Sequence, residues 1–175
     1  MKKLSLAAVA AFALVASPAF AADTSIGVVN IAKIMKDAKA ATSVREQVQA
    51  KQKALQAEVA AKRKDLIAED QALVKQKDKA DKATFEKKIK EFQDKAAAAD
   101  RQVQEKKEQL DKAFAVALEE IQQAVIGVVK EVADEKKINL AISSAQVLYN
   151  EPSADISDEV LKRLDAKLPK VTMKF

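Results

Sequence analysis

A cluster of seven lysines is the most chemically distinctive group in this chain. It lies within KQKDKADKATFEKKIK, residues 75–90, where three acidic residues leave an excess of four positive charges. Clustered ammonium groups raise the local concentration of anionic partners through their summed field. We call this group the lysine cluster; it consists of Lys75, Lys77, Lys79, Lys82, Lys87, Lys88 and Lys90.

The residue types that usually carry catalysis are missing from the sequence. The 175 residues include no histidine and no cysteine, which removes the commonest general base, a strong nucleophile and two frequent metal ligands. Nucleotide-binding loops need several glycines close together, whereas the two glycines here, Gly27 and Gly127, are far apart. The sequence therefore predicts no enzyme activity, no cofactor and no metal site.

The first 21 residues have the organisation of a secretory signal peptide. Lys2 and Lys3 precede an apolar run over residues 4–16, and Ala19-Phe20-Ala21 fits the small-x-small cleavage pattern. The apolar run is shorter than the roughly 20 residues that a membrane-spanning helix needs. We expect cleavage after Ala21 and a mature protein located in the periplasm.

Three interpretations of the lysine cluster remain open. The charges can keep an exposed turn hydrated, bind nucleic acid, or bind an anionic partner such as a lipid headgroup or an acidic protein. Nucleic acid is disfavoured by the export signal and by the lack of interleaved aromatic residues. Residues 45–112 hold 18 basic and 14 acidic side chains, so the whole excess of that region belongs to the cluster.

Long helices flank the cluster on both sides. No proline occurs between Pro18 and Pro152, and the composition is rich in strong helix formers. After the cluster, seam residues follow each other in alternating steps of four and three, as in a coiled coil: Phe85, Ile89, Phe92, Ala96, Ala99, Val103, Lys106 and Leu110. The pattern then slips by two steps of four, through Phe114 and Leu118.

The seam before the cluster is less complete. Its apolar residues are Val44, Val48, Leu55, Val59, Leu66 and Leu73, so polar residues such as Lys51, Lys62 and Glu69 fill alternate layers. Two seams around a polar joint favour an antiparallel hairpin with its tip near residues 75–84. One continuous helix is the alternative. Asp78 and Asp81 are candidate helix N-caps at the joint.

Short β-like segments lie outside the two helices. Ile26, Val28 and Val29 form one, and residues 138–150 give two more around a Ser-Ser-Ala bend. Three short strands make too small a sheet to be stable alone, so we expect copies of the chain to join there. The residues predicted to build this oligomerisation body are Ile26, Val28, Val29, Leu140, Ile142, Val147 and Tyr149.

A final helix is expected after residue 156, with Ser157 as its N-cap and Ile156 and Leu161 as a hydrophobic staple. The predicted fold is mainly α with a small β body, from which a long antiparallel helical hairpin projects. We expect a signal peptide at 1–21, a β-containing oligomerisation body at 22–45 and 113–175, and an arm at 46–112. The tail after Ala166 receives no interpretation.

These segments together resemble the Skp/OmpH family of periplasmic chaperones. The resemblance rests on IGVVNIAKIM, the alanine- and lysine-rich hairpin, INLAISSAQVLYN and DISDEVLKRL, and it extends to about Ala166. It implies a homotrimer whose arms enclose a cavity that holds unfolded outer-membrane proteins without nucleotide. It also implies lipopolysaccharide as an anionic partner; Lys106 and Lys107 lie in the corresponding region, but no such site is assigned.

A rival function is a structural coiled-coil spacer of the cell envelope, or a protein that binds anionic lipid without clients. Such a spacer accounts for the helices and the signal equally well, and less well for the β segments and the lysine cluster. A tether also usually carries an anchor, and the sequence shows none.

Overall fold

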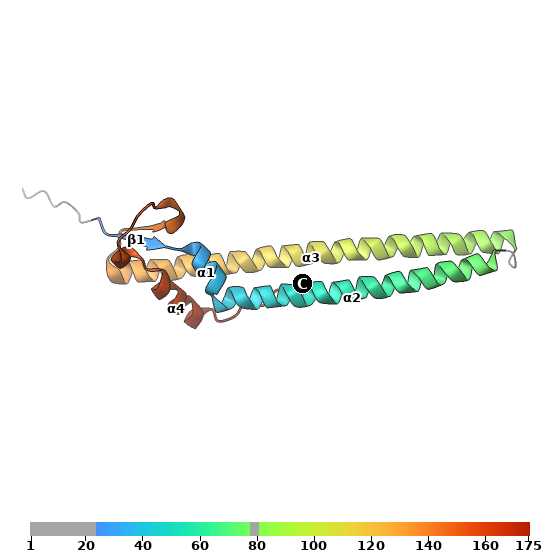
Figure 1. The fold of residues 1–175 in the computed structure, drawn as a ribbon, viewed down its shortest axis with the longest axis horizontal. Helices are drawn as coiled ribbons and strands as arrows, with labels where there is room; N and C mark the ends of the chain where they lie inside the picture. Colours follow the sequence, from blue (N-terminus) through green and yellow to red (C-terminus); the bar gives the residue numbers. More distant parts are fainter. Residues whose placement is uncertain (1–23, 78–80) are drawn as a thin grey trace, which may run out of the picture.

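The computed structural model describes residues 24–77 and 81–175. Its two long helices, α2 (Lys39–Gln76) and α3 (Lys82–Lys136), run side by side away from a small body that holds all the other elements (Figure 1). The predicted fold class, mainly helical with a small β body and a long hairpin, is confirmed. We use "arm" for the part of the hairpin within residues 46–112 and "body" for the other described residues.

The hairpin alternative is therefore correct, and the single continuous helix is wrong. The carboxylate of Asp81 accepts a hydrogen bond from the Thr84 backbone N–H at 3.0 Å and so caps the start of α3. Helix α3 ends at Lys136, and Lys137, with a positive φ of 58°, is its left-handed C-cap. Asp78, the other predicted cap, lies outside the described residues.

The body contains a parallel pair of strands, β1 (Ile26–Val29) and β2 (Leu140–Ser143), which face each other in register. Parallel strands need a long crossover, and here the whole hairpin is that crossover. Gly27 allows the close approach of Ile138 and Ile156, whose side chains would lie 3.1 and 3.2 Å from an added Cβ. Residues 147–149 form no strand in the described chain, so the expectation of three strands is wrong for the single subunit.

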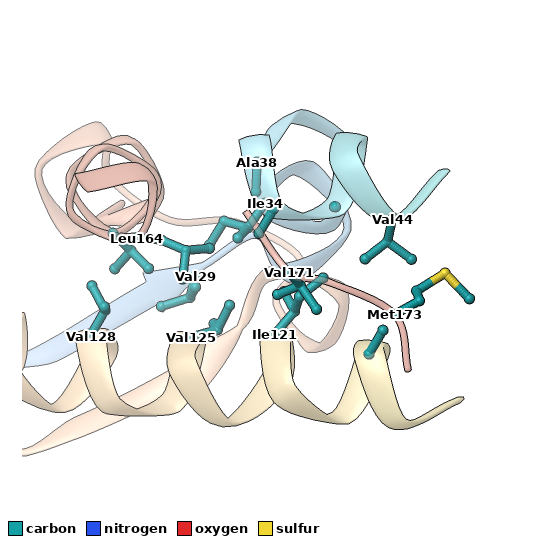
Figure 2. Packing of buried hydrophobic residues seen from close by; sticks show 14 of the residues in the cluster. Val29, Ile34, Ala38, Val44, Ile121, Val125, Val128, Leu164, Val171 and Met173 are labelled. Atoms are coloured by element: carbon teal, nitrogen blue, oxygen red, sulfur yellow. The ribbon is translucent and has the colours of Figure 1, made fainter. Parts of the chain in front are cut away.

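One hydrophobic core joins the body to the root of the hairpin (Figure 2). Short helix α1 (Ile31–Asp37) contributes Ile34, and the final helix α4 (Ser157–Lys167) contributes Val160 and Leu164. The buried stripe of α3 slips by consecutive steps of four, as predicted, but through Ala113 and Ala117 and not through Leu118 and the exposed Phe114. The stripe consists of Leu110, Ala113, Ala117, Ile121, Val125, Val128 and Val132.

The start of α4 differs from the prediction. Ser157 is the first residue of the helix, and its hydroxyl accepts a hydrogen bond from the Asn30 backbone N–H at 2.8 Å. Asp155 supplies the local cap, because its carboxylate accepts the Ser157 N–H at 2.8 Å. Hydrogen bonding to the Ser157 side chain, and then to its backbone, lowers the pKa of Asp155. Two 3-10 turns, Ser144–Gln146 and Pro152–Ala154, connect β2 to this helix. Ser157 therefore ties α4 to the end of β1 instead of capping its own helix.

The tail after α4 packs back on the root of the hairpin. Val171 and Met173 are 1% and 5% exposed, and Figure 2 shows them between the start of α2 and the stripe of α3. Ser43 and Gln47 on α2 bind the tail backbone through their side chains. The segment that the sequence left without interpretation is therefore part of the core.

Candidate functional site

The lysine cluster lies at the end of the molecule farthest from the body (Figure 1). Lys75 is in the last turn of α2, and Lys77 follows directly after the helix. Lys79 lies outside the described residues. The other members occupy the first three turns of α3: Lys82, Lys87, Lys88 and Lys90. Helical geometry thus places a mid-sequence cluster at a spatial extremity.

Acidic side chains neutralise the cluster only weakly. Lys82 reaches Glu86 and Lys87 reaches Glu91 at 3.9 Å in each case, with both lysine side chains more than three-quarters exposed. Exposed i,i+4 pairs of this kind contribute about 0.3–0.5 kcal/mol to the free energy of unfolding. Lys88 donates to the side-chain oxygen of Gln76 at 2.5 Å, which ties the two helix ends together. The positive charge therefore remains accessible to an anionic partner.

A groove runs between α2 and α3 along the arm. Its larger part has a volume of about 980 Å³, and a second hollow of about 300 Å³ continues it toward Phe92, sharing Val59 and Val103 with the first. The apolar walls of the larger part are interrupted by basic side chains. They consist of Leu55, Val59, Ile67, Val103 and Leu110, with Arg63, Lys64 and Lys107 beside them.

Ion pairs bridge the polar layers of the arm. Lys106, the single polar position in the return seam, donates to Glu58 at 2.5 Å, and this hydrogen bond holds the pKa of Glu58 below its ordinary value. Lys95 pairs with Glu69 at 2.7 Å, which raises the pKa of Lys95. Lys62, predicted as a gap in the outgoing seam, contacts Glu58 at 3.3 Å and Gln102. The polar layers are therefore bonded across the arm at its surface.

The residues predicted for the oligomerisation body divide into buried and exposed groups. Val28 and Val29 are 3% exposed and belong to the core of the single chain. Ile26, Leu140 and Tyr149 are exposed, and Ile142 and Val147 are half-buried. In the described residues, β2 pairs with no strand except β1, so its outer edge is open. The exposed group and this edge form one candidate assembly surface.

Sequence reasoning missed three exposed apolar residues. Val116 and Ile126 on α3 are each 61% exposed, and Leu148 is fully exposed after β2. Val116 and Ile126 lie off the buried stripe of the same helix, and no periodic signal in the sequence marks them. Leu148 lies in the second predicted β segment of residues 138–150, and the sequence analysis gave it no role of its own.

None of the described helices is both long and apolar enough to cross a membrane. Nor do residues 24–77 and 81–175 bring three or more acidic side chains together in a group able to hold a metal ion.

Comparison with known proteins identifies a family and a crystal structure with a similar fold. Residues 25–164 match the family model described as "Outer membrane protein (OmpH-like)". A candidate OmpH-like outer membrane chaperone from Caulobacter crescentus CB15, known from a crystal structure, superposes with a TM-score of 0.80 at 20% identity; the match covers 86% of this chain and 89% of that one. Curated proteins gave no match. Because the family match spans most of the sequence, this chain belongs to the OmpH-like family.

Proposed function

We propose that this protein is a periplasmic holdase chaperone, which binds unfolded outer-membrane proteins between helical arms and prevents their aggregation without nucleotide. The observation that carries the proposal is the arm itself. It joins a long, open, partly apolar groove to a strongly basic tip, and it projects from a well-packed body. Family membership supports the same role.

An unfolded β-barrel protein exposes alternating apolar side chains and unpaired backbone groups. A protein that holds many such clients needs a large surface of weak contacts instead of one tight pocket. Residues 46–76 of α2 lie in the arm and at 1.5 Å per residue extend for about 46 Å, so each arm offers a long surface of this kind. A homotrimer joined through the candidate assembly surface would set three arms around one cavity.

The test is dilution of a urea-unfolded outer-membrane β-barrel protein into buffer with the purified mature chain, followed by light scattering. We expect suppressed scattering at near-stoichiometric trimer and no effect of added nucleotide. A mass measurement by light scattering on the same sample should give three chains. Full aggregation of the client in the presence of folded trimer would contradict the proposal and favour a spacer or a lipid-binding protein without clients.

A pair of matched variants tests the groove. Val59→Gln with Val103→Gln places polar amides on the groove walls, and we expect weaker suppression of aggregation with an unchanged oligomer. Val74→Gln makes the same chemical change on an exposed position of α2 outside the groove walls. That control should protect the client as well as the unmodified chain does.

A further inference from the structure

The tail after α4 has the chemistry of an unfolded β-strand. Pro169 cannot continue a helix, and no regular element follows it. The next residues alternate apolar and polar side chains, from Val171 through Met173 to the terminal Phe175. Membrane β-strands show this same period of two.

Ser43 and Gln47 on α2 form a seat for the tail, and their side chains hydrogen-bond to the tail's backbone. The Gln47 side-chain amide donates to the Val171 carbonyl at 2.7 Å and accepts the Met173 N–H at 3.0 Å. The Ser43 hydroxyl accepts the Val171 N–H at 3.2 Å. Residues i and i+2 of an extended segment direct their backbone groups to the same side. Two side chains of α2 thus substitute for a neighbouring strand, and these bonds are independent of the tail's own side chains.

The seat also accepts every second side chain. Val171 and Met173 are buried between α2 and α3, whereas Thr172 and Lys174 between them are exposed. Backbone hydrogen bonds combined with pockets for alternate side chains are the features of recognition by strand addition. The seat therefore suits extended segments of alternating pattern as a class.

The end of the tail lies beside the first turns of the arm. The ring of Phe175 lies 4.0 Å from the Lys51 ammonium and lines a hollow of about 200 Å³. This hollow shares Leu55 and Leu110 with the larger groove farther out on the arm. The end of the tail therefore lies next to the seam leucines that also line the groove.

We propose that residues 169–175 are a built-in occupant of a strand-binding seat at the root of the arm, and that extended client segments with apolar residues at alternate positions displace them. This inference rests on the proposed function for the identity of the displacing segment. Because the tail is tethered, it competes at an effective concentration near the millimolar range. Free peptides at micromolar concentration should therefore bind the unmodified chain poorly.

The direct test loosens the tail in the full chain. In the variant Val171→Ser with Met173→Ser, a fluorescent peptide KLPKVTMKF should bind at least tenfold more tightly than it binds the unmodified chain. The matched control, Thr172→Ser with Lys174→Ser, changes the exposed tail residues and should bind as the unmodified chain does. A peptide KLPKVMTKF, in which the alternation is broken, should lose most of the gain. Circular dichroism checks that each variant is folded.

Two results would overturn the inference: equal binding of both peptides to the loosened variant, or no gain over the unmodified chain. Adding Gln47→Leu to the loosened variant should also abolish the gain, since it removes the amide that reads the backbone.

The unmodified chain supplies a second readout, which covers the case that loosening the tail unfolds the protein. Saturating unfolded client should speed hydrogen exchange at the Val171 and Met173 amides at least threefold. Displacement of the tail would break the hydrogen bonds from these amides to Ser43 and Gln47. Unchanged exchange with bound client would refute displacement but leave the holdase proposal intact. Tighter peptide binding to the loosened variant, without any suppression of client aggregation, would refute the holdase proposal but leave the strand-binding seat intact.

Discussion

The body and the arm are built from the same kinds of residues but bury them to different degrees. In the body, Ile34, Ile121 and Leu164 are 0% exposed, whereas in the described part of the arm only Leu73 and Leu110 are buried. Helix α3 belongs to both regions, so the difference does not come from secondary structure. It comes from what lies against the helix: several elements and the tail in the body, and one partner helix in the arm.

The consequence is a division of stability within one chain. Most helical stability in proteins comes from packing of the apolar face, and regions with few buried contacts open at lower free energy. The body can therefore hold the subunit together, and the proposed oligomer with it, while the arm opens and adapts. A cavity lined by such arms would fit clients of different size.

The largest expected effect separates folding from assembly within one strand. Val28→Asp buries an unpaired charge at a 3% exposed position, which costs several kcal/mol, on the order of the total stability. We expect loss of the folded state, seen as loss of helical circular dichroism. Ile26→Asp changes an exposed position two residues away and should keep the fold but dissociate the oligomer. If the Ile26→Asp variant remained a trimer, Ile26 would have no role in the assembly surface.

Matched leucine truncations compare the two cores directly. Leu164→Ala leaves a cavity at a fully buried body position and should lower the free energy of unfolding by about 2–5 kcal/mol. Leu66→Ala, at a half-buried arm position, should cost about 1 kcal/mol, because less area leaves contact. Urea unfolding followed by circular dichroism measures both values. Equal losses would mean that the arm is as well packed as the body.

Hydrogen exchange along α3 tests the division within a single helix. Amides of residues 82–95, in the arm, should exchange on the order of tenfold or more faster than those of residues 121–132, in the body. Mass spectrometry of peptic fragments resolves the two segments. Uniform slow exchange along α3 would contradict an arm that opens independently.

An acid titration addresses the surface ion pairs of each region. Arg163 donates to both carboxylate oxygens of Glu135 at 2.6 Å, and this lowers the pKa of Glu135. Because the folded-state pKa lies below the unfolded value, the stabilisation is present above about pH 4.3 and is lost as the pH falls through the folded pKa. Glu135→Gln should therefore lower the thermal midpoint at neutral pH, and the difference should shrink in acid.

Glu58→Gln is the matched change in the arm, where Lys106 lowers the carboxyl pKa in the same direction. It should shift the global midpoint less, since the arm contributes less to cooperative stability. A larger shift for Glu58→Gln than for Glu135→Gln would reverse the comparison.

The sequence predicted the arm better than the body, for a physical reason. A hairpin follows from local signals: heptad spacing, the Asp81 cap and the absence of breakers between Pro18 and Pro152. The body depends on contacts between residues more than a hundred positions apart, such as Asn30 with Ser157 and Gln47 with Met173. No periodicity records such contacts, so the role of Ser157 and the packing of the tail were missed.

The direction of side chains around α3 also limited what the sequence could predict. The spacing of apolar residues made Phe114 a seam residue, but the buried stripe continues through the smaller Ala113 and Ala117, which belong to the closely packed core. The lysine cluster, by contrast, was located at the tip correctly because its place depends only on the hairpin. Its role as an anionic-partner surface, and the roles of Ile26, Val28, Val29, Leu140, Ile142, Val147 and Tyr149 in assembly, remain predictions.

The smallest expected effect on stability belongs to the lysine cluster, where a change should act on binding alone. A variant with Lys77, Lys79, Lys87 and Lys88 replaced by Gln keeps strong helix formers and removes four charges from the tip. Exposed charges are screened over about 8 Å at physiological ionic strength, and they influence association rate more than complex lifetime. We therefore expect the same oligomer, slower capture of acidic unfolded outer-membrane proteins, weaker binding to anionic liposomes, and a shallower salt dependence of both. Stopped-flow fluorescence measures the capture rate, and client release should be unchanged, since the proposed function assigns client retention to the groove and not to the tip. If the capture rate and its salt dependence match those of the unmodified chain, the cluster only keeps an exposed turn hydrated, and the arm differs from the body in packing but not in electrostatic function.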